Sequence, residues 1–230
     1  MKVLNLLLAF TAMCLLIINI GISTMPINQQ PSVDIARQVG APHVVPFRVL
    51  AMNNARFATG FHMEFFGKVF IVTNRHVCDA NVKDINPQYA QFGSDIVKII
   101  AIDTEHDLCL LESPRSSGLK LAAFDAVELE PVYLVGHPRG EALTIREGRK
   151  MDEGQMIADW LDNREVTYTQ ISTITYGGNS GSPVTNMKGE VVGVLFAGDR
   201  RFVTEGYYVP HRYLKTFLFR VLLKVDFSTK

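Results

Sequence analysis

Three side chains of this chain could together cleave an amide or ester bond. A serine hydroxyl is a weak nucleophile until a neighbouring base removes its proton, and that base needs an acceptor on its other ring nitrogen. His76 follows an apolar run, Asp107 opens another apolar run, and Ser180 lies in a glycine-rich turn. These residue types, in this order, indicate nucleophilic catalysis in which Ser180 attacks, His76 is the base and Asp107 orients the histidine.

The turn around Ser180 has a second chemical property. Residues 177–183 read Gly-Gly-Asn-Ser-Gly-Ser-Pro, and glycines allow successive backbone N–H groups to turn inward. Inward N–H groups can bind the negative charge that develops when a carbonyl carbon is attacked. The turn therefore has the composition of an oxyanion site.

Other chemistries fit these residues less well. An α/β-hydrolase needs Gly-x-Ser-x-Gly with the histidine last, whereas Ser182 stands at the second glycine position and His76 comes first. A zinc site is not expected, because there is no His-Glu-x-x-His motif and His76 with Cys78 and Cys109 lacks a fourth ligand. We expect no metal and no cofactor. The alternative that stays open is a catalytically silent protein of the same fold that acts as a binding module.

The elements that position these residues read as β-strands. Short β-branched or aromatic runs are separated by Gly, Pro, Asn and Asp, which predicts an all-β barrel or sandwich. Residues 113–118, Ser-Pro-Arg-Ser-Ser-Gly, divide the runs into two sets. The expected strands are residues 47–52, 57–66, 69–73, 96–103 and 108–112, followed by 132–136, 142–145, 166–173, 190–197 and 206–209.

The end of the chain has a helical period instead. Its apolar residues fall on one face of an amphipathic helix, which we expect over residues 211–225. The opposite face is basic, and we interpret it as solvated, with membrane-surface contact as the alternative. The apolar positions are Leu214, Phe217, Leu218, Val221, Leu222 and Val225, and the basic ones are Arg212, Lys215, Arg220 and Lys224.

The beginning of the chain differs from the rest in composition. Of residues 1–23, 17 are apolar and only Lys2 is charged, so this leader is a signal peptide cleaved after Ser23 or a retained membrane anchor. In both cases we expect the body to be exported. Residues 24–45, rich in proline and glutamine, read as a linker. The whole chain balances 23 basic against 23 acidic residues, which argues against a nucleic-acid partner.

Taken together, the motifs resemble the trypsin-like serine endopeptidases, and in particular the bacterial HtrA/Deg-type branch. The resemblance extends over about residues 46–222. The residues that carry it are Thr59-Gly60-Phe61, Thr73-Asn74-Arg75-His76, Asp107-Leu108-Cys109-Leu110-Leu111, Val135-Gly136-His137-Pro138-Arg139-Gly140, Gly178-Asn179-Ser180-Gly181 and Gly189-Glu190-Val191-Val192-Gly193-Val194.

The resemblance implies two six-stranded antiparallel β-barrels in a protease domain over residues 46–225. The first barrel would span about 46–118 and the second about 119–210, followed by the helix. His76, Asp107 and Ser180 would form a triad that hydrolyses peptide bonds in proteins or peptides, with the N–H groups of Gly178 and Ser180 as the oxyanion hole. Because the chain ends soon after the helix, we expect no PDZ domain and no regulation through one. The oligomeric state stays open.

The resemblance also implies a primary specificity pocket. Ile174, six residues before the serine, would form its floor and Leu195-Phe196-Ala197 its wall, so we expect cleavage after small or medium apolar residues. The segment 149–165, with Trp160, would border the pocket, and whether it gates activity stays open. Cys78 and Cys109 each lie two residues past a triad member. We expect two buried thiols there, with a disulfide as the alternative.

Overall fold

The computed structural model describes residues 33–51, 54–82, 89–92, 95–198 and 204–227. Residues 33–230 form one compact unit. The apolar leader lies outside the described residues. Within them, none of the helices combines the length and the apolar character that a bilayer crossing requires.

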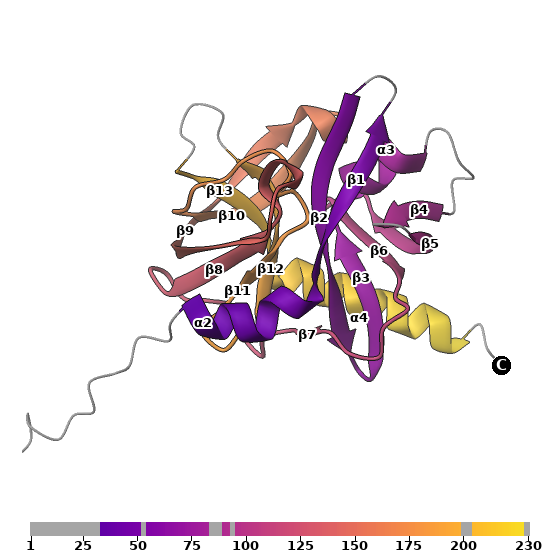
Figure 1. The fold of residues 1–230 in the computed structure, drawn as a ribbon, viewed down its shortest axis with the longest axis horizontal. Coiled ribbons are helices and arrows are strands. Elements are labelled where there is room, and N and C mark those ends of the chain that lie inside the picture. The colour runs from indigo at the N-terminus through magenta and orange to yellow at the C-terminus, as the bar shows by residue number, and fades with distance from the viewer. Residues whose placement is uncertain (1–32, 52–53, 83–88, 93–94, 199–203, 228–230) are drawn as a thin grey trace, which may run out of the picture. The chain divides into compact units, whose positions relative to one another are not determined.

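The first half of the molecule is an antiparallel sheet of six strands in the order β1-β2-β3-β6-β5-β4, in which β1 also contacts β4 (Figure 1). A short seventh strand, β7, pairs with β2 in parallel. The strands are β1 (Val44–Ala51), β2 (Asn54–Phe65), β3 (Lys68–Thr73), β4 (Tyr89–Phe92), β5 (Asp95–Asp103), β6 (Leu108–Glu112) and β7 (Leu119–Lys120). We call these strands the first sheet.

The second half is a closed barrel in the order β10-β13-β12-β11-β8-β9. Its strands are β8 (Pro131–Gly136), β9 (Thr144–Ala158), β10 (Arg164–Ile171), β11 (Pro183–Thr185), β12 (Val191–Gly198) and β13 (Gly206–Pro210). We call them the second barrel. Two six-stranded antiparallel units with a C-terminal helix confirm the predicted fold class.

Most expected strands are present, because each buries a run of apolar side chains. β6 is buried at four of its five positions, and the first six positions of β12 are all buried. The largest departure is β9, because only residues 142–145 were expected to form a strand and the segment 149–165 was expected only to border the pocket. Residues 144–149 of β9 pair with β8 and residues 150–158 pair with β10, so this long strand joins two neighbours and closes the barrel.

Helices form the first and the last elements of residues 33–227. The predicted C-terminal helix is confirmed as α4 (His211–Phe227), which buries Leu214, Phe217, Leu218, Val221 and Leu222. Residues 33–43, which we had assigned to the linker, instead form α2 (Val33–Ile35) and two further helical turns, Ala36–Gly40 and Ala41–His43. Ala36 is 1% exposed and lies in the main core cluster, so the folded body begins earlier than expected.

Candidate active site

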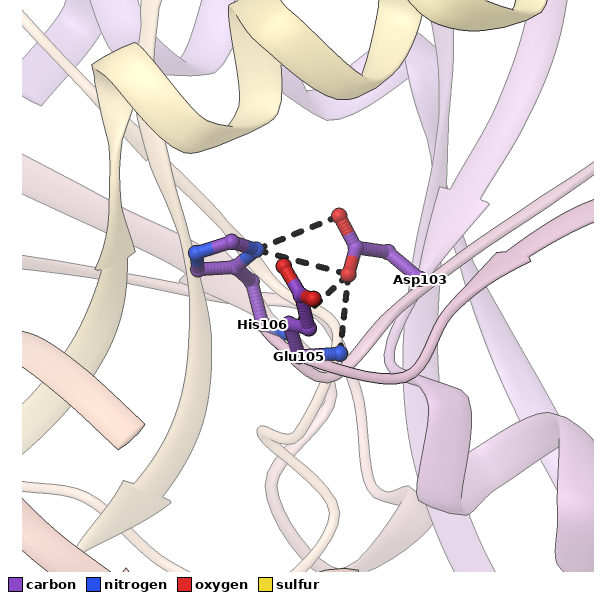
Figure 2. A group of neighbouring side chains, drawn as sticks. All are labelled: Asp103, Glu105 and His106. Carbon is purple, nitrogen blue, oxygen red and sulfur yellow. Dashed lines mark hydrogen bonds and ion pairs between the residues drawn. The ribbon is translucent and has the colours of Figure 1, made fainter. Parts of the chain in front are cut away.

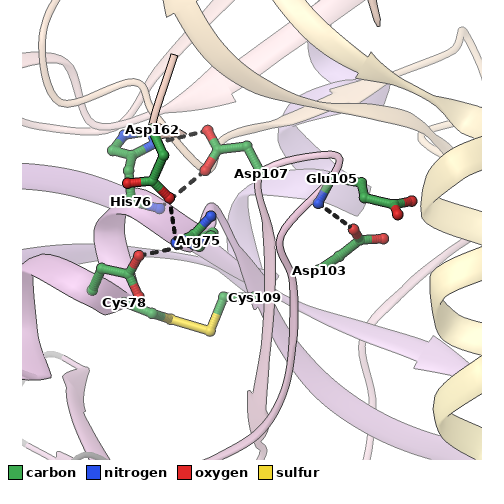
Figure 3. A network of polar contacts seen from close by, with 9 residues as sticks. Arg75, His76, Cys78, Asp103, Glu105, Asp107, Cys109 and Asp162 are labelled. Atoms are coloured by element: carbon green, nitrogen blue, oxygen red, sulfur yellow. Dashed lines mark hydrogen bonds and ion pairs between the residues drawn. A yellow bond between two sulfur atoms is a disulfide. The ribbon is translucent and has the colours of Figure 1, made fainter. Parts of the chain in front are cut away.

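His76 and Asp107 lie together because their two segments meet at one end of the first sheet. His76 is the second residue of α3 (Arg75–Val82), which follows β3, and Asp107 directly precedes β6, the neighbour of β3. His76 Nδ1 is 2.8 Å from Asp107 Oδ2, and the His76 backbone N–H donates to Asp107 Oδ1 at 3.0 Å (Figure 3). The carboxylate thus engages one ring nitrogen and leaves Nε2 for another partner.

The backbone of Asp107 is held in an unusual conformation. Its φ of 54° lies in the left-handed region, which costs a non-glycine residue about 1 kcal/mol or more. Its carbonyl oxygen accepts hydrogen bonds from the Asn74 side chain at 3.0 Å and from the Arg75 backbone N–H at 3.1 Å. The buried Asn74 thereby fixes the turn that aims the carboxylate.

A disulfide joins the same two segments. Cys78 and Cys109 are bonded to each other, with 6.5 Å between their Cα atoms, and both are fully buried (Figure 3). The expectation of two separate thiols is therefore wrong. Spacing in the sequence could not decide the question, because the separation of the cysteines depends on how β3, α3 and β6 pack.

Ser180 faces the same cavity as His76. The cavity holds about 400 Å³ and is lined by His76, Trp160, Thr175, Tyr176, Gly177, Ser180, Leu195, Phe196, Ala197 and Gly198. Ser180 Oγ donates to the carbonyl oxygen of Phe196 at 3.3 Å, and within the described part of the chain no hydrogen bond joins Ser180 to His76. The structure brings the three predicted residues to one site, with the serine hydroxyl turned to a backbone carbonyl.

The N–H groups around Ser180 fall into two classes. Those of Asn179, Gly181 and Ser182 donate to the carbonyls of Tyr176, Leu195 and Asn179. Those of Gly178 and Ser180 donate to no acceptor among the described residues. Within the described residues, both N–H groups predicted as oxyanion donors are thus available to bind a ligand oxygen.

The predicted specificity pocket is only partly where we expected it. Leu195, Phe196 and Ala197 line the cavity with Ser180, but Ile174 lines a different cavity of about 550 Å³, beside Ile145 and Met151. Thr175 takes the expected place of Ile174, and its hydroxyl donates to the Glu205 carbonyl at 2.9 Å. Neighbouring residues of this turn point in different directions, and the sequence does not reveal which of the two faces the Ser180 cavity.

Trp160 borders the cavity, as expected. It lies in the helical turn Asp159–Leu161 between β9 and β10, and its ring centroid is 6.5 Å from that of His76 and 6.2 Å from that of Phe196. The following Asp162 pairs with Arg75 at 3.4 Å (Figure 3). This connection ties the second barrel to the helix that carries His76.

A cluster of two acidic residues and one histidine lies just before Asp107. Donor atoms of Asp103, Glu105 and His106 lie within 4.8 Å of one another, as in a metal site (Figure 2). However, Asp103 Oδ2 is 3.0 Å from the Arg220 guanidinium of α4, and Asp103 Oδ1 accepts the backbone N–H groups of Glu105 and His106. A cation already neutralises the carboxylate, so we interpret this group as the anchor of α4.

The electrostatics of this anchor agree with that interpretation. Burial acts to raise the pKa of Asp103, but hydrogen bonds from the His106 side chain and the Glu105 backbone outweigh it and hold the pKa below its ordinary value. His106 also stacks on Tyr213 of α4, with ring centroids 4.0 Å apart. The turn before Asp107 is therefore fixed to the end of the chain.

Sequence reasoning missed one residue that contacts the Ser180 turn. Thr59, on β2, is fully buried, and its hydroxyl donates to the Gly178 carbonyl at 2.8 Å. Its backbone N–H donates to the Ser180 carbonyl at 2.8 Å. The only signal in the sequence was its place beside Gly60-Phe61 in one of the matched motifs.

Comparison with known proteins agrees with this geometry. Residues 58–194 match the family model described as trypsin-like peptidase domain. A probable periplasmic serine endoprotease DegP-like of Rickettsia conorii is 31% identical over 171 residues, which cover 71% of this chain and 33% of that protein. The corresponding protein of Rickettsia prowazekii is 30% identical over 66% of this chain and 31% of its own length. The chain thus spans about a third of the curated relatives it matches.

Solved structures share the fold. The active form of the Rv3671c protease from M. tuberculosis has a TM-score of 0.61 and 23% identity, covering 78% of this chain and 79% of that chain. The serine endoprotease from Yersinia pestis has a TM-score of 0.63 and 20% identity. The match covers 83% of this chain and 66% of that chain. With the family model matching more than half of its residues, the chain belongs to the trypsin-like peptidase family.

Proposed function

We propose that this protein is a serine endopeptidase that hydrolyses peptide bonds in proteins through Ser180, His76 and Asp107. The observation that carries the proposal is the bond between His76 Nδ1 and Asp107 Oδ2, formed where His76 and Ser180 line one cavity. The family membership and the serine endoproteases among the relatives support it.

The reaction begins with rotation of the Ser180 side chain away from the Phe196 carbonyl and toward His76 Nε2. As Ser180 Oγ attacks the substrate carbonyl carbon, its proton passes to Nε2, and Asp107 stabilises the resulting imidazolium. The N–H groups of Gly178 and Ser180 bind the oxyanion. His76 then gives the proton to the leaving amine, and an acyl-enzyme on Ser180 remains.

The second half of the reaction returns the enzyme to its starting state. A water molecule loses a proton to His76 Nε2 as its oxygen attacks the acyl carbon. Collapse of the second tetrahedral intermediate breaks the ester bond, releases the carboxylic acid product and returns the proton to Ser180 Oγ. The proposal requires no metal or other cofactor.

The cavity beside Ser180 supports a preference for small or medium apolar side chains before the cleaved bond. Leu195 and Ala197 supply apolar lining, and none of the described lining residues is acidic, so a substrate Lys or Arg finds no counter-ion among them. A peptide-library profile dominated by basic residues at that position would overturn this preference.

The place of action follows from the leader. The apolar residues 1–23 and the periplasmic relatives support export of the body across a membrane. N-terminal sequencing of the mature protein distinguishes a cleaved signal peptide from a retained membrane anchor. A first residue of Thr24 indicates a cleaved signal peptide, and a first residue of Met1 indicates an anchor.

The central test replaces Ser180 by alanine. We expect turnover of unfolded casein to fall by about 10⁶-fold, with little change in the free energy of unfolding, because the variant cannot form the acyl-enzyme. A fluorophosphonate should label the wild type on Ser180 and leave Ser180→Ala unlabelled. Ser182→Ala is the matched control, since Ser182 is fully buried and should not react.

Two outcomes would contradict the proposal. If folded wild type neither cleaves casein nor takes the label, the chain is not an active endopeptidase. If Ser180→Ala binds the same partner with the same biological effect as the wild type, the binding-module alternative is correct. Retained cleavage by Ser180→Ala would instead exclude Ser180 as the nucleophile.

A further inference from the structure

Thr59 connects the first sheet to two separate segments of the second barrel. Its hydroxyl donates to the Gly178 carbonyl at 2.8 Å and accepts the His137 backbone N–H at 3.0 Å. Its own N–H donates to the Ser180 carbonyl at 2.8 Å. Because Thr59 is fully buried, water does not compete for these hydrogen bonds. One hydroxyl therefore links the Ser180 turn, the segment after β8 and strand β2.

The segment after β8 holds the neighbouring peptide. The Arg139 N–H donates to the Gly177 carbonyl at 2.6 Å, and in a planar trans peptide the following N–H points the opposite way. That N–H belongs to Gly178 and has no acceptor among the described residues. Arg139 thus sets the direction of the Gly178 N–H, while Thr59 sets the direction of the Gly178 carbonyl.

This turn needs such external support because its own sequence is permissive. Gly178 has a φ of 99° and Gly181 a φ of 84°, and glycine can occupy several alternative conformations at little cost. The support is also close-fitting. A Cβ on Gly178 would lie 2.5 Å from the Arg139 nitrogen and 2.7 Å from the His137 carbonyl oxygen.

We propose that Thr59 is a positioning residue for the oxyanion site. Its hydroxyl holds the Gly178–Asn179 peptide directly and, through His137, the segment whose Arg139 N–H holds the Gly177–Gly178 peptide, so that the Gly178 N–H can bind the oxyanion. The inference rests on the proposed function and names a residue of the first sheet that acts on a turn of the second barrel. The hydroxyl contributes through the direction of the N–H groups and does not touch the substrate.

The test compares substitutions that remove this hydroxyl with one that keeps it. Thr59→Val keeps the shape and removes the hydroxyl, whereas Thr59→Ser keeps the hydroxyl and removes a methyl group. Thr185→Val is the matched control, because Thr185 is also fully buried and its hydroxyl donates to a backbone carbonyl, that of Tyr133, away from the Ser180 turn. Thr59→Ala provides a smaller replacement if valine does not fit.

We expect Thr59→Val to lower kcat by about 10- to 100-fold and to leave KM within about threefold of the wild-type value. Misdirected N–H groups bind the oxyanion of the tetrahedral intermediate less well, whereas binding of the uncharged substrate is unaffected. A peptide boronate, which forms a tetrahedral adduct on Ser180, should bind more weakly by a similar factor. The same peptide ending in an amide should bind unchanged. Thr59→Ser should restore most of kcat, and Thr185→Val should leave kcat unchanged.

Several results would overturn the inference. If folded Thr59→Val or Thr59→Ala keeps wild-type kcat and wild-type boronate affinity, the hydroxyl has no positioning role, and the proposed function stands. A loss of kcat in Thr185→Val as large as in Thr59→Val would indicate a general effect of removing a buried hydroxyl. Absence of activity and of fluorophosphonate labelling in the wild type would instead overturn the proposed function itself.

Discussion

Side chains and a disulfide fix the segments that carry His76 and Asp107, whereas backbone hydrogen bonds fix most of the turn that carries Ser180. On the first side, the Asn74 side chain and the Cys78–Cys109 bond hold the strained Asp107 turn. On the second side, the peptides around Gly178 are held by a single hydroxyl and by backbone N–H groups. A covalent bond therefore helps to hold the Asp107 turn, whereas the Ser180 turn keeps its shape because its glycines carry no side chains.

The largest effect expected from disturbing the first side is that of Asp107→Asn. Asparagine tolerates the left-handed φ of 54°, so the backbone should stay in place while the amide favours the wrong histidine tautomer. We expect kcat to fall by about 10⁴-fold with the free energy of unfolding changed by less than about 2 kcal/mol. Steady-state kinetics and urea unfolding measure the two quantities. If the variant loses activity because it is unfolded in the assay, Asp107 acts mainly in stability.

The Ser180 side can be tested with two adjacent glycines. A Cβ on Gly178 would meet Arg139 and His137, whereas a Cβ on Gly177 would meet nothing within 4 Å. Gly178→Ala should therefore displace the oxyanion N–H and lower kcat by about 10²- to 10³-fold. Gly177→Ala should lower kcat far less than Gly178→Ala, because its Cβ would meet no other protein atom within 4 Å. Equal kinetics in the two variants would show that the turn relaxes without harm.

Removal of the disulfide should separate stability from activity. Cross-linking residues 31 positions apart restricts the unfolded chain, and we expect Cys78→Ala with Cys109→Ala to cost roughly 3–4 kcal/mol of unfolding free energy. At temperatures where the variant stays folded, kcat should fall less than tenfold, because Asn74 and Arg75 still hold the Asp107 carbonyl. A larger kcat loss in the folded variant would make the disulfide part of the positioning of Asp107.

The first sheet should also respond to pH. Burial, together with the positive charges of Arg115 and His43, lowers the pKa of His62 to about 4. The folded state therefore binds this proton more weakly than the unfolded chain, and stability is lost as pH falls from about 6.5 toward 4. We expect a loss of about 3 kcal/mol over that range, measured by urea unfolding. His62→Gln should flatten this slope, and an unchanged slope would assign the acid sensitivity to other groups.

Features that depend on residue type were predictable from the sequence. The fold class and most strands followed from apolar runs, and the types and order of His76, Asp107 and Ser180 led to residues that the structure places at one site. Features that depend on packing were less predictable. Much of β9 is polar because many of its side chains are exposed, so its pairing with β8 and β10 left little hydrophobic signal.

The remaining misses have the same physical origin. Ile174 and Thr175 are neighbours in one turn, and only the folded backbone decides which of them faces the cavity. Thr59 forms hydrogen bonds to residues 78 and 119 positions away, which no local pattern can indicate. The Cys78–Cys109 bond likewise depends on how two segments meet.

The anchoring of α4 also sets an order of events during synthesis. Arg220 reaches Asp103 across 117 positions of the chain, and Tyr213 stacks on His106 directly beside Asp107. Because a nascent chain emerges with its N-terminus first, His76, Asp107 and Ser180 are all made before the helix that secures the Asp107 turn. A growing chain therefore lacks the contacts that anchor the Asp107 turn until α4 has been made, so this turn is secured only after all three residues of the site have been synthesised.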